Sequence, residues 1–184
     1  MKMKGKILTG AALIGVVFFY SCNNEAGKSN NQLISDNQVL QQADGSISLK
    51  VDNADCYSDL SNPSSNTAEW DVLITKSGRF DVWLSSATKD TTKLEYKNPV
   101  LLSIHDNRLE MHPECDKVVH NSSDVSYPYF RADSFMGSLY IQDTGHYNIQ
   151  IISDKIIPQE DINDESSLSE SSKILSVLLT PVNR

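Results

Sequence analysis

Apolar and polar residues alternate along most of the chain beyond residue 45. A period of two is typical of β-strands that bury one face, whereas an amphipathic helix would show a period of 3.6 residues. No window combines a helical stripe with helix caps. The alternation therefore predicts an all-β domain with strands in these windows: 47–51, 70–74, 80–84, 100–104, 109–111, 127–129, 139–141, 147–151 and 175–179.

Two features predict tight turns between these strands. His105-Asp106-Asn107-Arg108 separates two apolar windows, and Asp106-Asn107 is predicted as the turn pair of a hairpin. The segments 74–84 and 141–151 also share one pattern: an aliphatic residue, a Ser/Thr-Gly pair, a basic residue or His, an aromatic residue and Asp/Asn. We expect two equivalent hairpins to explain this repeated pattern, with an internal duplication as the alternative.

The N-terminus has the pattern of an export signal. Three lysines lie within the first six residues, and residues 7–20 follow without a charge. This run of 14 residues is shorter than the roughly 20 that a transmembrane helix needs. We therefore interpret residues 1–21 as a signal peptide.

The end of that segment, Phe19-Tyr20-Ser21-Cys22, resembles the lipobox of bacterial lipoproteins. The resemblance implies that Cys22 is lipidated, and an ordinary secretory peptide with an incidental cysteine is the alternative. Residues 22–44 are polar and rich in Asn, which predicts a flexible, disordered tether before a domain at 45–184. No Asp follows Cys22 directly, so we expect the anchor to lie in the outer membrane, with the periplasmic or surface side left open.

Charge narrows the range of partners. The chain has 16 basic and 24 acidic residues, and removal of the signal peptide leaves 13 basic residues and a net charge of −11. Nucleic-acid binding and polybasic membrane docking both need positive surfaces, so neither is expected. The roughly 140 residues after the tether are the size of one domain.

Cysteine and acidic residues leave two questions open. Cys56 and Cys115 could form a disulfide in an oxidising envelope or remain as free thiols. The segment 158–172 predicts a long solvated loop, although Asp161, Asp164 and Glu165 could hold a structural calcium ion. No other metal site, and no cofactor, is predicted.

The order of the strand motifs resembles carbohydrate-binding modules of the galactose-binding-like type. The resemblance covers about residues 45–182 and implies a jelly-roll β-sandwich of two antiparallel sheets. It is carried by motifs at 69–72, 77–84, 135–141, 143–147 and 175–181.

The same resemblance implies a sugar site in the loops at one edge of the sandwich. Aromatic rings of such sites stack on the apolar face of a pyranose, and polar groups bind its hydroxyls. The Asn that these modules carry before the final strand is replaced by Ser172 and Lys173. The residues that map to the site are Tyr127 and Tyr129, with Tyr57 in the first loop and Arg131 as a hydrogen-bond donor.

Trp83 is out of phase with the apolar residues of its strand and is expected on the other face of the sheet. There it would either bind a ligand or be covered by a loop.

Two functions remain after these observations. The first is a non-catalytic module that holds a polysaccharide or glycoconjugate near the envelope, since no catalytic motif is present. The second is a structural lipoprotein that uses the same sandwich to bind an envelope protein. Aromatic residues clustered in one concave patch would favour the first, and dispersed aromatic residues the second.

Overall fold

The computed structural model describes residues 38–156 and 172–182, which belong to one unit, Ile34–Arg184. The predicted signal peptide, Cys22 and the three residues named for calcium lie outside the described residues. Among the described residues, no helix has the length and apolar character needed to span a bilayer.

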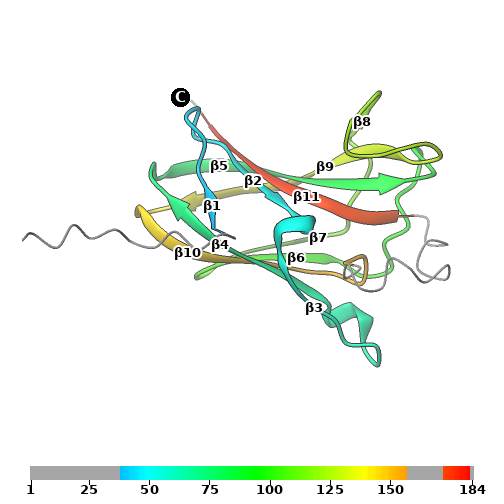
Figure 1. Cartoon of the computed structure of the whole chain (residues 1–184), viewed down its shortest axis with the longest axis horizontal. Helices are drawn as coiled ribbons and strands as arrows, with labels where there is room; N and C mark the ends of the chain where they lie inside the picture. The colour runs from blue at the N-terminus through cyan, green and yellow to red at the C-terminus, as the bar shows by residue number, and fades with distance from the viewer. Residues whose placement is uncertain (1–37, 157–171, 183–184) are drawn as a thin grey trace, which may run out of the picture. The chain divides into compact units, whose positions relative to one another are not determined.

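Two sheets make up the fold, and Figure 1 shows them as two facing layers. The connections between strands follow a jelly-roll pattern, because most of them cross from one sheet to the other. Two one-turn 3-10 helices, Val51–Asn53 and Pro63–Ser65, are the only helices in the described part of the chain. Sheet A contains β1 (Val39–Leu40), β3 (Asp55–Tyr57), β4 (Thr67–Ile74), β6 (Val100–Ile104), β7 (Asn107–Met111) and β10 (Gly145–Ile152). Sheet B contains β2 (Ile47–Lys50), β5 (Gly78–Thr88), β8 (Lys117–Val119), β9 (Phe130–Ile141) and β11 (Ser172–Pro181).

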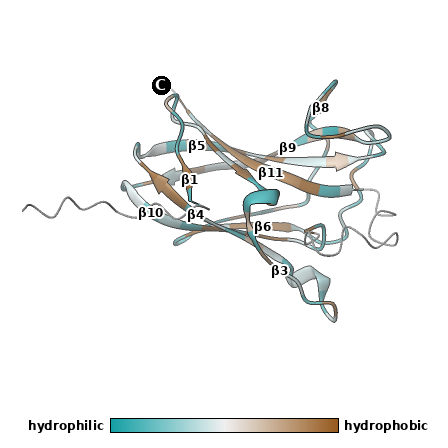
Figure 2. Cartoon of the chain, viewed as in Figure 1, coloured by the Kyte–Doolittle hydropathy of each residue, from teal (hydrophilic) through white to brown (hydrophobic). Residues whose placement is uncertain are grey.

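The hydrophobic core lies between the sheets and is made by the alternating apolar positions. Figure 2 shows hydrophobic residues recurring within the strands, with hydrophilic residues at most of the turns. Trp70 is 2% exposed, as its phase on β4 predicts, and its indole N–H donates to the Lys50 carbonyl over 2.8 Å. The prediction of an all-β jelly-roll sandwich is thus confirmed, with one parallel strand pair, β1–β4, in an otherwise antiparallel arrangement.

The two segments with the same sequence pattern were predicted to be hairpins, and this prediction is wrong. Each connects a strand of one sheet to a strand of the other: β4 to β5, and β9 to β10. The two connections lie side by side, because Gly78 pairs with Ile141 and Gly145 pairs with Ile74. Gly78, which begins β5, therefore lies opposite the last residue of β9. Gly145, which begins β10, lies opposite the last residue of β4.

Other local predictions need correction. The turn between β6 and β7 is His105-Asp106 rather than Asp106-Asn107, and His105 adopts the left-handed conformation with φ 51°. Histidine tolerates this region better than most residues. Residues 127–129 form a loop rather than a strand.

A bulge in β11 separates Ile174 from Ser176 and shifts the alternation there. Ile174, which is 4% exposed, therefore takes the core position predicted for Leu175.

The sandwich also begins earlier than residue 45. Residues 39–40, predicted as part of the tether, pair with β4. The Gln41 side chain then accepts hydrogen bonds from the backbone N–H groups of Thr75 and Lys76 at 2.9 and 2.7 Å. These contacts attach the start of the domain to the connection between β4 and β5.

The glycines in the two crossing connections should be required for stability. Gly78 and Gly145 have φ of 149° and 146°, a conformation that residues with a Cβ rarely adopt. A Cβ at either position would meet no atom within 4 Å, so the cost is one of backbone conformation rather than space. Gly78→Ala and Gly145→Ala should each lower the free energy of unfolding by about 1–3 kcal/mol.

Chemical denaturation measures this effect, with the neighbouring exposed Thr144→Ala as a control that should stay within about 0.5 kcal/mol of wild type. Equal stability of all three variants would contradict the conformational explanation.

Candidate functional site

The pairing of β5 with β9 arranges a row of side chains on the outer surface of sheet B. Side chains alternate between the two faces of a strand, so every second cross-strand pair points away from the core. We call this set the outer row. Its successive pairs are Trp83–Phe135, Ser85–Asp133 and Ala87–Arg131, and one step past the end of both strands Lys89 lies over Tyr129.

A β-bulge creates the aromatic pair of the outer row. The register between β5 and β9 shifts by one residue between Val82–Gly137 and Trp83–Phe135. The bulge lets Met136, which is 6% exposed, face the core while Phe135 faces outward with 40% exposure. The Trp83 and Phe135 ring centroids lie 5.1 Å apart with a 52° interplanar angle. Trp83 therefore lies on the outer face, as predicted, and only partly covered.

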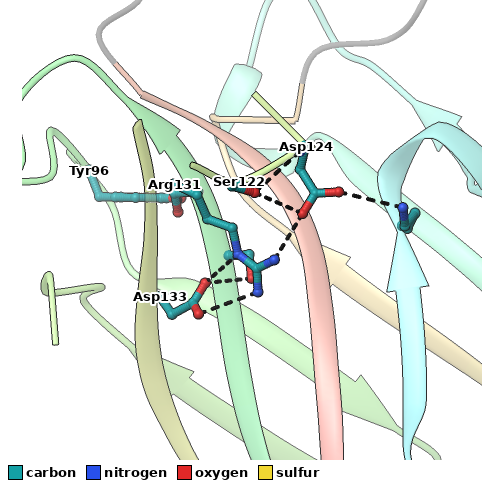
Figure 3. A network of polar contacts seen from close by, with 8 residues as sticks. Tyr96, Ser122, Asp124, Arg131 and Asp133 are labelled. Carbon is teal, nitrogen blue, oxygen red and sulfur yellow. Dashed lines mark hydrogen bonds and ion pairs between the residues drawn. The ribbon is translucent and has the colours of Figure 1, made fainter. Parts of the chain in front are cut away.

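A charged network lies beside this aromatic pair on the same face. Figure 3 shows the Arg131 guanidinium between the carboxylates of Asp124 and Asp133. It donates to each of them over 2.8 Å, and the Ser85 hydroxyl donates to Asp133 over 2.8 Å. Lys50 on β2 approaches the second Asp124 oxygen at 3.6 Å. The network attaches the segment 120–129, which precedes β9, to the outer surface of sheet B.

The environment of this network favours its charged forms. Burial opposes ionisation of Asp124, but hydrogen bonds from Ser122 and Arg131, with the charges of Lys50 and Arg131, lower its pKa below the ordinary value. Burial likewise opposes the charge on Arg131, yet hydrogen bonds and charges from Asp133 and Asp124 raise its pKa. Arg131 was predicted to donate hydrogen bonds to a ligand, but its guanidinium is engaged with two aspartates.

Next to the network, residues 123–129 line an open pocket of about 380 Å³, which we call the loop pocket. Pockets for small molecules span about 300–1,000 Å³. Its floor is Ala87 of β5 and Lys173 of β11, which are cross-strand partners. The wall is formed by residues 123–129, including Asp124, Tyr127 and Tyr129.

The two tyrosines of the loop pocket differ in their surroundings. Tyr127 is 91% exposed, so its ring is open to solvent. Tyr129 is half-buried, and the Lys89 ammonium lies 5.1 Å from its ring centroid. Cations at this distance are attracted by the ring's π-electrons. Tyr127 can therefore offer an open ring face, whereas the Lys89 ammonium lies over the ring of Tyr129.

The remaining predicted site residues lie elsewhere. Tyr57 is 59% exposed on β3 of sheet A and does not line the loop pocket. Cys56 precedes it on the same strand, and Cys115 lies shortly before β8 of sheet B. Both thiols are free and half-buried, which matches the free-thiol alternative, and burial raises the pKa of each.

A larger hollow of about 860 Å³ lies at the outer face of sheet A, at the turns that precede β7 and β10. Its lining is mainly polar, and several of its groups are engaged with other protein groups. The amides of Asn148 and Gln150 both donate to the Glu69 carboxylate, and the Tyr147 hydroxyl donates to the Asp143 carbonyl over 2.8 Å. We interpret this hollow as the solvated face of the sheet. Among the described residues, no group of three or more His, Cys, Asp or Glu side chains is placed to hold a metal ion.

Comparisons with known proteins support the fold. No protein-family model matches the sequence, and the search of curated proteins finds no match. Among solved structures, 79% of the chain is similar to 24% of an α-L-fucosidase from Vibrio sp. strain EJY3, with 21% identity and a TM-score of 0.61. The chain thus spans about a quarter of that enzyme, and the similarity shows a shared fold.

Two weaker similarities involve carbohydrate-active proteins. A GH26-CBM35 β-(1,4)-mannanase from Podospora anserina has 12% identity and a TM-score of 0.46, with 77% of this chain and 28% of that chain covered. A CBM36-1 domain of a multidomain xylanase from the Trinervitermes trinervoides hindgut metagenome has 10% identity and a TM-score of 0.40, with 76% and 99% covered.

Sequence reasoning missed several residues of this surface. Phe135 is the partner of Trp83, and the signal for it is Gly137, since a glycine inside a strand often marks a bulge. Lys89 and Asp133 join the site only through the register of β5 and β9. No pattern in the sequence indicated that register.

Removal of Arg131 should destabilise the domain in a pH-dependent way. Arg131→Met leaves Asp133, which is 8% exposed, with less compensation for its charge and should cost about 1–3 kcal/mol at pH 7. The pKa of Asp124 is lower in the folded chain than in the unfolded chain. The ionised carboxylate therefore stabilises the fold above the ordinary Asp pKa, near 3.9, and this stabilisation is lost as pH falls through the pKa of the folded chain.

Thermal unfolding should therefore show a Tm difference between wild type and Arg131→Met that is large at pH 7 and small near pH 2. Lys50→Met, which removes a single exposed pair at 3.6 Å, should change the Tm little. An equal Tm difference for Arg131→Met at both pH values would contradict this account.

Proposed function

We propose that the domain is a non-catalytic carbohydrate-binding module and that its ligand contacts the loop pocket. The observation that carries the proposal is the open ring of Tyr127, 91% exposed, beside a pocket of about 380 Å³. Pyranose rings offer an apolar C–H face to an aromatic ring, and their hydroxyls bond to polar groups around it. The same pocket is lined by polar side chains that can form hydrogen bonds with the sugar hydroxyls: Ser123, Ser126 and Lys173.

The distribution of aromatic residues supports a glycan ligand over a dispersed scaffold surface. Tyr127 and Tyr129 line one pocket, and Trp83 lies on the same sheet face, four residues along β5 from the pocket floor at Ala87. Four residues of β-strand span about 13 Å. The Trp83–Phe135 pair is therefore within reach of a glycan of several sugars that starts at the loop pocket.

The network around Arg131 has a positioning role in this proposal. It holds Asp124 of the loop pocket against sheet B through contacts of 2.8 Å to Arg131. A wall held in this way loses little conformational entropy when a ligand binds, which favours affinity.

The ring of Tyr127 gives the sharpest test. Tyr127→Ala should reduce affinity for any glycan bound by the full chain by about tenfold or more, because the stacking surface is removed. Affinity electrophoresis after a glycan-array screen measures the change. Tyr57→Ala is the matched control: it removes an exposed tyrosine, 59% accessible, from the other sheet and should leave affinity unchanged.

Two results would contradict the proposal. The folded wild-type chain could bind no glycan, which would favour the protein-interaction lipoprotein and make the Trp83–Phe135 surface the region to test. Alternatively, Tyr57→Ala could abolish binding while Tyr127→Ala retains it, which would move the site to sheet A.

We further propose that the module is tethered to the cell envelope through a lipid on Cys22, with the outer membrane as the expected site. The support is the lipobox-like sequence and the polar stretch after it. Cys22→Ala should abolish incorporation of labelled palmitate. The variant chain should then either remain as an unprocessed precursor or, if another peptidase cleaves it, leave the membrane fraction. Palmitate incorporation that persists in Cys22→Ala would exclude this anchor.

A further inference from the structure

Basic side chains lie at and beside the loop pocket, although the chain as a whole is acidic. The chain carries a formal net charge of −8. Lys173 lines the pocket together with Asp124, and the ammonium of a second lysine, Lys89, lies 5.1 Å from the ring centroid of Tyr129, which also lines it. Neither forms an ion pair with any residue that the structure describes.

The strand register explains why these lysines are close together. Lys173 is the cross-strand partner of Ala87 on β5, and Lys89 follows directly after β5 ends at Thr88. Tyr129, whose ring lies under the Lys89 ammonium, lines the same pocket as Lys173. Both long side chains can therefore reach one anionic group.

The two aspartates of the Arg131 network are ion-paired. Asp124 accepts from Arg131 over 2.8 Å and lies 3.6 Å from Lys50, and Asp133 also accepts from Arg131. Asp90, which follows Lys89, is exposed and accepts hydrogen bonds from the backbone N–H and the hydroxyl of Thr92 at 2.8 and 2.6 Å. Among the described residues, Lys89 and Lys173 are therefore the basic groups at or beside the pocket that form no ion pair.

Resting on the proposed function, we infer that the loop pocket selects an anionic glycan, one whose sugars carry a carboxylate or a sulfate. Tyr127 stacks on the sugar ring, and Lys89 and Lys173 bind the anionic substituent. Tyr129 holds Lys89 in place through the cation–π contact at 5.1 Å.

Matched pairs of glycans test the inference directly. The full chain in detergent is titrated with polygalacturonate and with its carboxyl-reduced form, and then with a sulfated galactan and its desulfated form. We expect each anionic polymer that binds to do so more tightly than its neutral partner. This preference should weaken as salt rises from about 0.05 to about 0.5 M, because exposed charges become screened over this range.

Lysine variants identify the groups responsible. Lys89→Met and Lys173→Met should each lower affinity for the anionic polymer by about three- to fivefold, and the double variant by about tenfold or more. Affinity for the neutral partner should fall less than affinity for the anionic polymer, because the neutral polymer loses hydrogen bonds but no ion pair. Lys76→Met is the control: Lys76 has the same charge but lies in the connection between β4 and β5, at the other end of the sandwich.

The outcomes separate this inference from the proposed function. Equal binding of the charged and neutral partners, or an equal loss of affinity for both in the lysine variants, would overturn the anionic preference while leaving a glycan-binding module. Absence of binding to every glycan on an array of neutral and acidic types would overturn the proposed function and the inference with it. A preference that Lys76→Met abolishes as strongly as the pocket variants would show that net charge, not the pocket, is responsible.

Discussion

The pairing of β5 with β9 determines which side chains share the outer surface of sheet B. Eleven residue pairs hold the two strands together, and one bulge opposite Val82 adjusts their register. That register places Trp83 against Phe135 and Asp133 against Ser85, and it brings Lys89 to the ring of Tyr129. Ala87 and Lys173, which are far apart in sequence, line one pocket because β5 also pairs with β11.

The Arg131 network attaches a loop to the outer surface of sheet B. Loops usually move more than the strands they connect, and binding then costs conformational entropy. Here a guanidinium shared between two carboxylates attaches the segment 120–129 to the strands beneath it. In the proposed function, Arg131 therefore positions the segment 120–129, because its guanidinium is engaged with two aspartates. Lys89 and Lys173 form no ion pair with any described carboxylate.

Much of the fold could be predicted from the sequence, because a period of two in hydrophobicity directly reflects burial of one sheet face. The site was predicted less completely. Tyr127 and Tyr129 were identified through the resemblance to carbohydrate-binding modules, and Trp83 through its phase. The repeated pattern around Gly78 and Gly145 was misassigned to hairpins, since a tight turn within a sheet and a crossing between sheets use the same glycine conformation. Phe135 and Lys89 depend on strand register, which local patterns do not specify.

The central claim is that a glycan binds at the loop pocket on sheet B. The most direct measurement is NMR chemical-shift mapping of the isotope-labelled chain during titration with a bound glycan. The account predicts that the largest changes occur at Tyr127, Tyr129 and Lys173, with smaller changes at Trp83. Changes confined to Asn148 and Gln150, in the hollow of sheet A, would contradict it and move the binding surface to the opposite face of the sandwich.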